Sequence, residues 1–208
     1  MLIDKTVSGF VEELASNSPA PGGGSTAALA GTLGAALSVM VCNFTVDNPK
    51  FSDVKAEIFL VKKKGIDLKN SLMEYIDGDT DAFDEVMKVY KLPKGTDAEK
   101  TLRVERIQEA TKQATLLPLK VAESCIEVLK LSIKVLTIGN PNTACDAAVS
   151  GVTAYAGFLG AIFNVKINLN SIKDETFIQS VRDKMIGLQE GADNYNQLIL
   201  SRAKVVIG

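Results

Sequence analysis

Apolar residues recur at intervals of three and four positions along most of the chain, which is the period of an α-helix. This pattern predicts a short helix at residues 7–14 and long helices at about 52–90, 97–138 and 173–206. No stretch alternates with a period of two, apart from a short possibility at residues 164–169. The chain is therefore predicted to be all-α.

Two further segments predict helices of another kind, because they are apolar nearly all round. One begins at about Gly24 or Ser25 and ends at about Val46, and the other covers residues 147–165. Both are rich in small residues, which let neighbouring helices approach closely. We expect one domain, residues 1–208, built as an antiparallel multi-helix bundle with these two small-residue helices at its centre.

Two positions are expected to disturb the long helices. Asp77-Gly78 is a turn signal, and the acids that follow favour a fresh helix start, so the helix can break near residues 77–81. Pro118 lies inside the helix predicted at 97–138 and removes one backbone hydrogen bond, so a kink or a break is expected there.

Composition and charge narrow the function classes. The 208 residues are 46% hydrophobic and 23% charged, with a net charge of -2, which gives no reason to expect nucleic acid or a membrane surface as the partner. The uncharged run at 26–42 is short for a membrane span and full of small and polar residues. The N-terminal segment has acids where an export signal has basic residues, so a cytoplasmic protein is expected.

The chain contains no histidine, which excludes Ser-His-Asp and Cys-His mechanisms and the commonest zinc sites. Its three cysteines, Cys42, Cys125 and Cys145, are far apart in the sequence and lie in apolar runs. We expect them to be reduced core residues in a cytosolic protein.

A glycine-rich turn, Pro19-Ala-Pro-Gly-Gly-Gly-Ser25, precedes the first small-residue helix. The Lys-Ser/Thr pair of a nucleotide P-loop does not follow it, and no predicted strand precedes it. Glycines at a helix start leave backbone N–H groups accessible, so the turn can hold an anion or a developing negative charge. A tight turn without a ligand remains the alternative.

Acids and asparagines provide the other candidates. The cluster Asp77, Asp79, Asp81 and Asp84 lacks the spacing of an EF-hand and is typical of a solvated helix start. Without histidine, however, proton transfer must come from groups such as these.

The loop GNPNTACD at 139–146 contains Asn140, Asn142 and Asp146, which suit turns and caps. Asp146 precedes a buried helix, where a carboxylate needs a partner or a ligand. Asn164 and Asn168 pose the same question at the other end of that helix.

Five motifs occur in order between Pro19 and Leu169: PAPGGGSTAALAGTLGAALSVMVCNFT, DGDTDAFDEVMKVYKLPK, ATLLPLKVAE, GNPNTACDAAV and NVKINL. Together they resemble the cyclodeaminase/cyclohydrolase family, which acts on folates. The resemblance implies an all-helical homodimer that binds a tetrahydrofolate derivative as substrate near the glycine-rich turn, with no cofactor and no metal.

Three functions follow from this resemblance. The first is a methenyltetrahydrofolate cyclohydrolase, in which water opens the methenyl bridge to give 10-formyltetrahydrofolate. The second is a formiminotetrahydrofolate cyclodeaminase, in which N10 attacks the formimino carbon and ammonia leaves. A non-catalytic folate-binding or scaffold protein is the third.

The same resemblance implies roles for individual residues. Asp79 is the first candidate for proton transfer. Asp146 is the second candidate and can also anchor the pterin amino groups. The residues expected to bind the substrate are Gly22, Gly23, Gly24, Ser25, Asn140 and Asn164. The family commonly has serine where this chain has Cys145.

Overall fold

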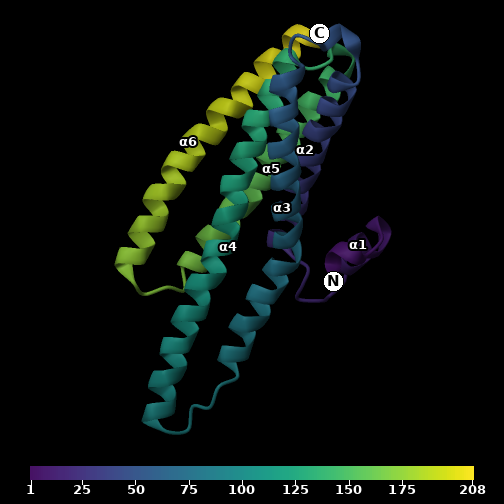
Figure 1. The fold of residues 1–208 in the computed structure, drawn as a ribbon. Coiled ribbons are helices and arrows are strands. Elements are labelled where there is room, and N and C mark those ends of the chain that lie inside the picture. Colours follow the sequence, from purple (N-terminus) through teal and green to yellow (C-terminus); the bar gives the residue numbers. More distant parts are fainter.

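A computed structural model describes all residues from 1 to 208 and contains six α-helices and no strand (Figure 1). This confirms the prediction of an all-α fold. Three short 3₁₀ turns precede α1, α3 and α5. The helices are α1 (Val7–Leu14), α2 (Gly23–Val46), α3 (Lys55–Tyr90), α4 (Asp97–Ile138), α5 (Ala144–Leu169) and α6 (Glu175–Val206).

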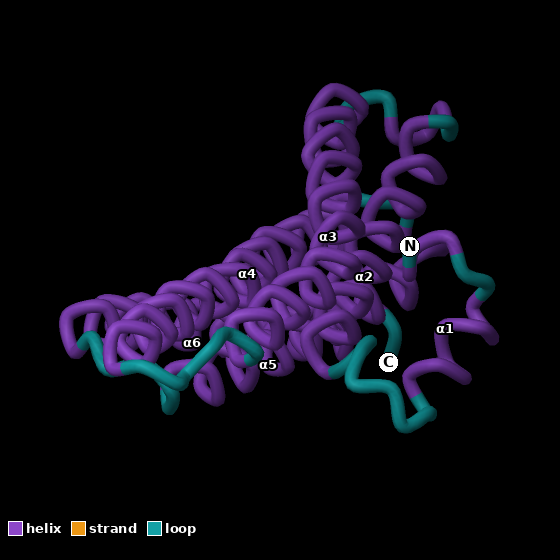
Figure 2. Tube along the Cα trace, turned by 90° about the horizontal axis from the view of Figure 1, so that it is seen from below, coloured by secondary structure: helices purple, strands orange, loops and turns teal.

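The five long helices form a packed bundle in which successive helices run in opposite directions (Figure 1). α2 packs against α3, α4 and α5, and α5 also packs against α4 and α6. The lower part of the α3–α4 hairpin extends beyond the start of α2 and the end of α5 (Figure 1). α1 lies beside the bundle in the ribbon and tube views (Figures 1 and 2), and its one buried residue, Phe10, belongs to the hydrophobic core.

α2 and α5 approach one another closely because small residues line their contact. The Ser150 hydroxyl donates to the Gly34 carbonyl oxygen at 2.6 Å and lies 2.8 Å from the Ser38 hydroxyl, so these buried polar groups are satisfied. A Cβ on Gly157 would lie 2.8 Å from the Ala27 carbonyl oxygen. The two backbones are therefore in direct contact at this point.

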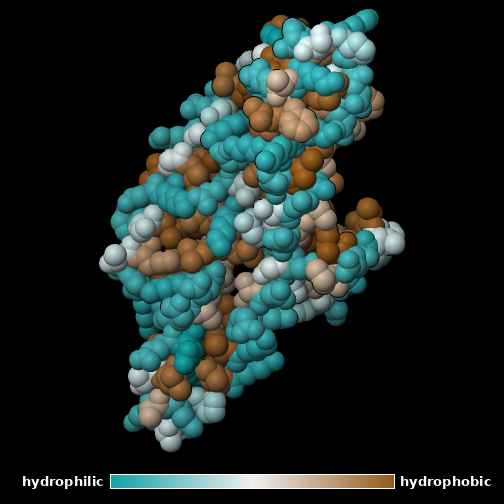
Figure 3. Space-filling model, viewed as in Figure 1, coloured by the Kyte–Doolittle hydropathy of each residue, from teal (hydrophilic) through white to brown (hydrophobic).

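The small-residue helices are core helices of the bundle, but each keeps an exposed face. Both are long and apolar enough to cross a membrane, yet half of the apolar window in each is buried inside the bundle. Because both helices are apolar nearly all round, we expected them to be buried on every side. In the single chain, one side of each helix remains exposed. The opposite face, formed by α3, α4 and α6, is mainly hydrophilic with scattered apolar patches (Figure 3).

α3 is continuous through residues 77–81, so the expected break is absent. The acids there have tertiary partners and do not cap a new helix. The Asp77 carboxylate accepts from the backbone N–H groups of Leu2 and Ile3, and Asp79 accepts from the N–H of Ser25. Asp81 and Asp84 are exposed.

α4 runs through Pro118 without a break. Proline has no N–H to donate to the carbonyl four residues before it, which is that of Ala114. The Asn168 side chain from α5 donates to this Ala114 oxygen at 3.0 Å. A tertiary contact thus replaces the lost backbone hydrogen bond.

Two smaller expectations are also wrong. Residues 164–169 are the last part of α5 and form no strand. Cys145 is exposed in the first turn of α5, although Cys42 and Cys125 are buried as expected. Burial raises the pKa of the Cys42 thiol to about 11 and that of Cys125 to about 12, so both stay protonated at neutral pH.

Gly157→Ala tests the close contact between α2 and α5. The added methyl meets the Ala27 carbonyl oxygen and the Gly31 nitrogen, at 2.8 and 2.9 Å, and backbone atoms cannot turn aside. We expect a loss of about 1–3 kcal/mol in the free energy of unfolding, measured by denaturant unfolding.

The matched control is Gly187→Ala on α6, where nothing lies within 4 Å of the added methyl. This change should stabilise by about 0.5–1 kcal/mol, because alanine is the better helix former. Equal effects of the two substitutions would contradict the close packing.

Candidate active site

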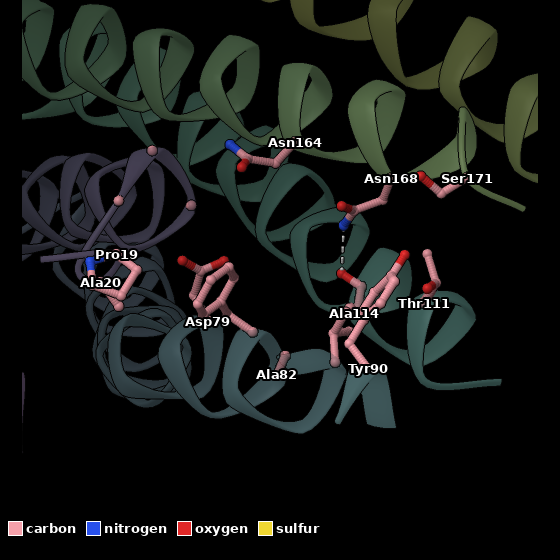
Figure 4. A pocket seen from close by; sticks show the side chains of 15 residues that line it. Pro19, Ala20, Asp79, Ala82, Tyr90, Thr111, Ala114, Asn164, Asn168 and Ser171 are labelled. Carbon is pink, nitrogen blue, oxygen red and sulfur yellow. Dashed lines mark hydrogen bonds between the residues drawn. The ribbon is translucent and has the colours of Figure 1, made fainter. Parts of the chain in front are cut away.

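A cavity of about 320 Å³ lies where α2 begins and α5 ends, against the α3–α4 hairpin (Figure 4). This size is within the range of small-molecule sites. Because successive helices run in opposite directions, the start of α2 and the end of α5 lie at the same end of the bundle. Fifteen residues line the cavity: Pro19, Ala20, Gly22, Gly23, Gly24, Asp79, Ala82, Phe83, Val86, Tyr90, Thr111, Ala114, Asn164, Asn168 and Ser171.

Asp79 projects from α3 toward the first turn of α2. Its Oδ2 accepts a hydrogen bond of 2.8 Å from the Ser25 N–H and lies 3.2 Å from the Ser25 hydroxyl. The carboxylate therefore caps α2 from another helix. Neither Ser25 nor Thr26 caps α2 with its own side chain, because Ser25 holds the carboxylate and Thr26 Oγ1 donates to the Gly22 carbonyl oxygen.

Ser25 does not line the cavity. Its side chain is fully buried behind Asp79, and the hydroxyl lies 2.9 Å from the Ile76 carbonyl oxygen. The structure thus places Ser25 where it can position Asp79. The expected contact between its hydroxyl and a ligand has no room in this arrangement.

The start of α2 presents unpaired donors to the cavity. The N–H groups of Gly23 and Gly24 have no hydrogen-bond partner, as expected for the first turn of a helix. A Cβ on Gly24 would overlap the Asp79 carboxylate, so the carboxylate can take this position only beside a glycine. Backbone donors and a carboxylate therefore share one wall of the cavity.

The pKa of Asp79 is raised above its ordinary value because burial penalises the charged form. The hydrogen bonds from Ser25 act in the opposite direction and offset part of this effect. A carboxyl with a raised pKa in a cavity is suited to take up and release a proton closer to neutral pH. The electrostatics thus agree with the role expected for Asp79.

Asn164 and Asn168 face Asp79 from the last turns of α5 (Figure 4). The Asn164 amide donates to the Gly160 carbonyl oxygen at 2.8 Å, which leaves its own oxygen and one N–H toward the cavity. Asn168 is held by Ala114, as described above. Their spacing of four residues on a helix places both on one face.

Four further residues of the cavity were not identified from the sequence. Tyr90 and Phe83 provide aromatic surface from α3, and Thr111 and Ser171 provide hydroxyl groups. Hydroxyls and aromatic rings are common in helices and turns alike, so no local pattern distinguishes them.

Asp146 and Asn140 lie away from this cavity. Asp146 is in the first turn of α5, about 27 Å along the helix from Asn164. The Asn140 N–H donates to Thr45 Oγ1 at 2.9 Å and its side-chain amide to the Phe44 carbonyl oxygen at 3.2 Å. Asn140 thus joins the α4–α5 turn to the end of α2, and its expected role at the substrate remains a prediction.

Comparison with known proteins gives a consistent result. Residues 6–186 match the profile of a family described as formiminotransferase-cyclodeaminase. A methenyltetrahydrofolate cyclohydrolase from Methylorubrum extorquens is 40% identical over 201 residues, which cover 97% of each chain. A formimidoyltransferase-cyclodeaminase from Mus musculus is 32% identical over 199 residues, which are 96% of this chain and 37% of that protein.

The fold also matches a solved structure. The crystal structure of formiminotetrahydrofolate cyclodeaminase from Thermotoga maritima superposes with a TM-score of 0.89, at 25% identity, over 100% of both chains. The resemblance found in the five sequence motifs is thereby confirmed.

Asp79→Asn tests the cost of burying this carboxylate. Because the pKa of Asp79 is raised in the folded wild type, the unfolded chain loses the Asp79 proton at a lower pH than the folded protein does. The free energy of unfolding therefore falls as the pH rises from about 4 through the raised pKa. The amide carries no charge and still accepts from Ser25. We expect the Tm of Asp79→Asn minus that of wild type to increase between pH 4 and pH 8.

Asp81→Asn is the control for this measurement, because Asp81 is exposed on the same helix. Its difference in Tm should vary little over the same range. A difference for Asp79→Asn that is independent of pH would contradict the raised pKa.

Proposed function

This chain belongs to the formiminotransferase-cyclodeaminase family, and from that premise we propose that it is a methenyltetrahydrofolate cyclohydrolase. It is an enzyme of folate one-carbon metabolism. The observation that carries the proposal is the half-buried Asp79 carboxylate, which shares a cavity with the free N–H groups at the start of α2. The full-length similarity to a cyclohydrolase supports this choice of reaction. Residues 1–208 act as one domain, in the cytoplasm.

Asp79 moves the protons of this reaction. Water adds to the methenyl carbon, and Asp79 accepts the proton that the water loses. The bond from this carbon to N5 then breaks, N5 takes up a proton, and the carbon becomes the formyl group on N10. One proton is released overall. A single carboxyl with a raised pKa can serve both transfers.

The other residues of the cavity bind and orient the folate. The N–H groups of Gly23 and Gly24 face negative charge that develops on the added oxygen. Asn164 and Asn168 offer both donors and acceptors to the pterin edge. Tyr90 and Phe83 give flat apolar surface to the folate rings.

The cyclodeaminase reaction is the second candidate. The likeness in fold to the Thermotoga maritima protein favours it, because that structure is one of a formiminotetrahydrofolate cyclodeaminase. Both reactions pass through a tetrahedral carbon bound to nitrogen, so Asp79 would serve either. A non-catalytic folate-binding or scaffold protein is the third candidate, and the full-length similarity to a cyclohydrolase argues against it.

The enzyme acts as a homodimer. The exposed faces of α2 and α5 support this, because a second copy would cover them. In the dimer α2 and α5 become central helices, as their apolar pattern predicts. Within one chain Asp146 and Asn140 lie away from the cavity, so their expected roles in the active site remain predictions.

The test of the proposed function is a spectrophotometric assay with Asp79→Asn. Wild type should remove the absorbance of methenyltetrahydrofolate, and Asp79→Asn should lower kcat by at least about 100-fold, since a general acid-base group contributes this much. Asp81→Asn should keep the wild-type rate.

The same assay separates the alternatives. Formation of methenyltetrahydrofolate from formiminotetrahydrofolate, with release of ammonia, would identify the cyclodeaminase. Folate binding without turnover in either assay would contradict an enzyme.

Ser25→Ala tests the positioning role of Ser25. Its hydroxyl lowers the pKa of Asp79, so its removal should raise that pKa further. If ionised Asp79 accepts the proton of water, the rising limb of kcat/KM against pH should move to higher pH. Thr26→Val is the control, because Thr26 is exposed and bonds only within α2. A change in KM without movement of the limb would contradict this role.

A further inference from the structure

The cavity at the start of α2 contains one carboxylate and no basic side chain. Among its fifteen lining residues, Asp79 and Tyr90 are the titratable ones, and none is a lysine or an arginine. A phenol is neutral near pH 7, so ionised Asp79 is the only full charge on the cavity wall. A charged group that is partly removed from water needs a counter-charge. The cavity wall provides none.

The helix ends around the cavity do not neutralise this carboxylate. The start of α2 contributes about half a positive charge and the end of α5 about half a negative charge, so the two roughly cancel. Asp79 points into the space between these two ends, opposite Asn164 (Figure 4). Its hydrogen bonds come from the Ser25 N–H and hydroxyl, which are neutral groups. The cavity is therefore negatively charged whenever Asp79 is ionised.

Basic side chains on α4, the helix opposite, have other partners. Arg103 donates to the Tyr90 carbonyl oxygen at 2.9 Å and lies 5.5 Å from the centre of the Tyr90 ring. Lys112 forms an ion pair of 2.7 Å with Asp174. The pKa of Asp79 is set by burial and by hydrogen bonds, and no basic side chain is among its causes. A ligand is thus the remaining source of a counter-charge.

The substrates of both candidate reactions carry such a charge. The methenyl bridge of methenyltetrahydrofolate is a cation whose charge is shared between N5 and N10. A formimino group on N5 is an amidine, which is protonated at neutral pH. The formyl group of 10-formyltetrahydrofolate is neutral. Positive charge on the one-carbon unit therefore distinguishes these substrates from the formyl product.

We propose that ionised Asp79 is the counter-ion of a positively charged one-carbon unit, and that the cavity thereby selects cationic folates over neutral ones. The ion pair forms before any proton moves, so this role in specificity is separate from proton transfer. Addition of water removes the positive charge, and the neutral formyl product no longer has the ion pair. The inference rests on the proposed function, because it requires a folate in this cavity, but it holds for either reaction.

Two folates of nearly the same shape test the selection. The group on N5 ends in a positively charged nitrogen in 5-formiminotetrahydrofolate and in a neutral oxygen in 5-formyltetrahydrofolate. A methenyltetrahydrofolate cyclohydrolase converts neither, so isothermal titration calorimetry can measure both dissociation constants at equilibrium. We expect wild type to bind the formimino folate at least about tenfold more tightly, because a hydrogen bond to a charged group contributes at least this much.

Asp79→Asn keeps the shape of the side chain and removes its charge. This variant should bind the formimino folate at least about tenfold more weakly than wild type, and the formyl folate with equal or higher affinity. Asp81→Asn, exposed on the same helix, should keep the wild-type preference. A preference that survives in Asp79→Asn would overturn the proposal, as would equal binding of both folates by wild type.

The pH dependence of the wild type provides a second test that needs no variant. Affinity for the formimino folate should rise with pH through the pKa of Asp79, which burial raises, because only the ionised carboxylate pairs with the cation. Affinity for the formyl folate should not show this rise. An affinity for the formimino folate that is constant from about pH 4 to pH 8 would contradict the ion pair.

Other titratable groups around the cavity do not produce the same rise. α2, α4 and α5 contribute no titratable side chain to the cavity wall, and α3 contributes only Tyr90 besides Asp79. Asp77 on α3 accepts from the N-terminal turn, and Asp81 is exposed. Asp79 is thus the group whose ionisation the formimino folate reports.

The proposed reaction and the proposed counter-ion fail in different ways. A wild type that hydrolyses methenyltetrahydrofolate but binds the two probe folates equally would retain the reaction and overturn the counter-ion. A wild type without turnover that prefers the formimino folate, and loses this preference in Asp79→Asn, would overturn the reaction and support the counter-ion.

Discussion

The contact between α2 and α5 fixes the geometry on which the site depends. Glycine, alanine and serine line this contact, so the two backbones touch near Gly157 and Ala27. Larger residues would increase the distance between the helix axes by up to about 2 Å, and the start of α2 would then move away from the end of α5. The cavity exists because these two helix ends, carrying free N–H groups and asparagines, are held side by side.

Asp79 connects the stability of the fold to its chemistry. It caps the first turn of α2 from α3 and at the same time faces the cavity. Burial raises its pKa, which is unfavourable for folding at neutral pH but favourable for proton transfer. Asn168 has a similar double role, since it lies in the cavity and bonds the Ala114 carbonyl that Pro118 leaves free.

The helical period was enough to predict six helices and most of their ends. It failed where local signals compete with tertiary contacts. In the sequence, Asp77 and Asp79 indicate the start of a new helix. In the structure they accept hydrogen bonds from the N-terminal turn and from α2, and α3 continues. Pro118 reads as a break, but Asn168 satisfies the freed carbonyl. In each case the partner lies far away in the sequence.

The sequence by itself determined the helices, the family and the residue types available for catalysis. Periodicity, motif order and the lack of histidine can all be read from the chain without knowing which residues meet in space. Only the tertiary structure decided which of those residues meet. It brings Asp79, the glycine-rich turn and Asn164 to one cavity, buries Ser25 behind the carboxylate, and leaves Asp146 and Asn140 at the far end of α5. The reason is that a long helix separates its two ends, while packing unites residues from four different helices in one cavity.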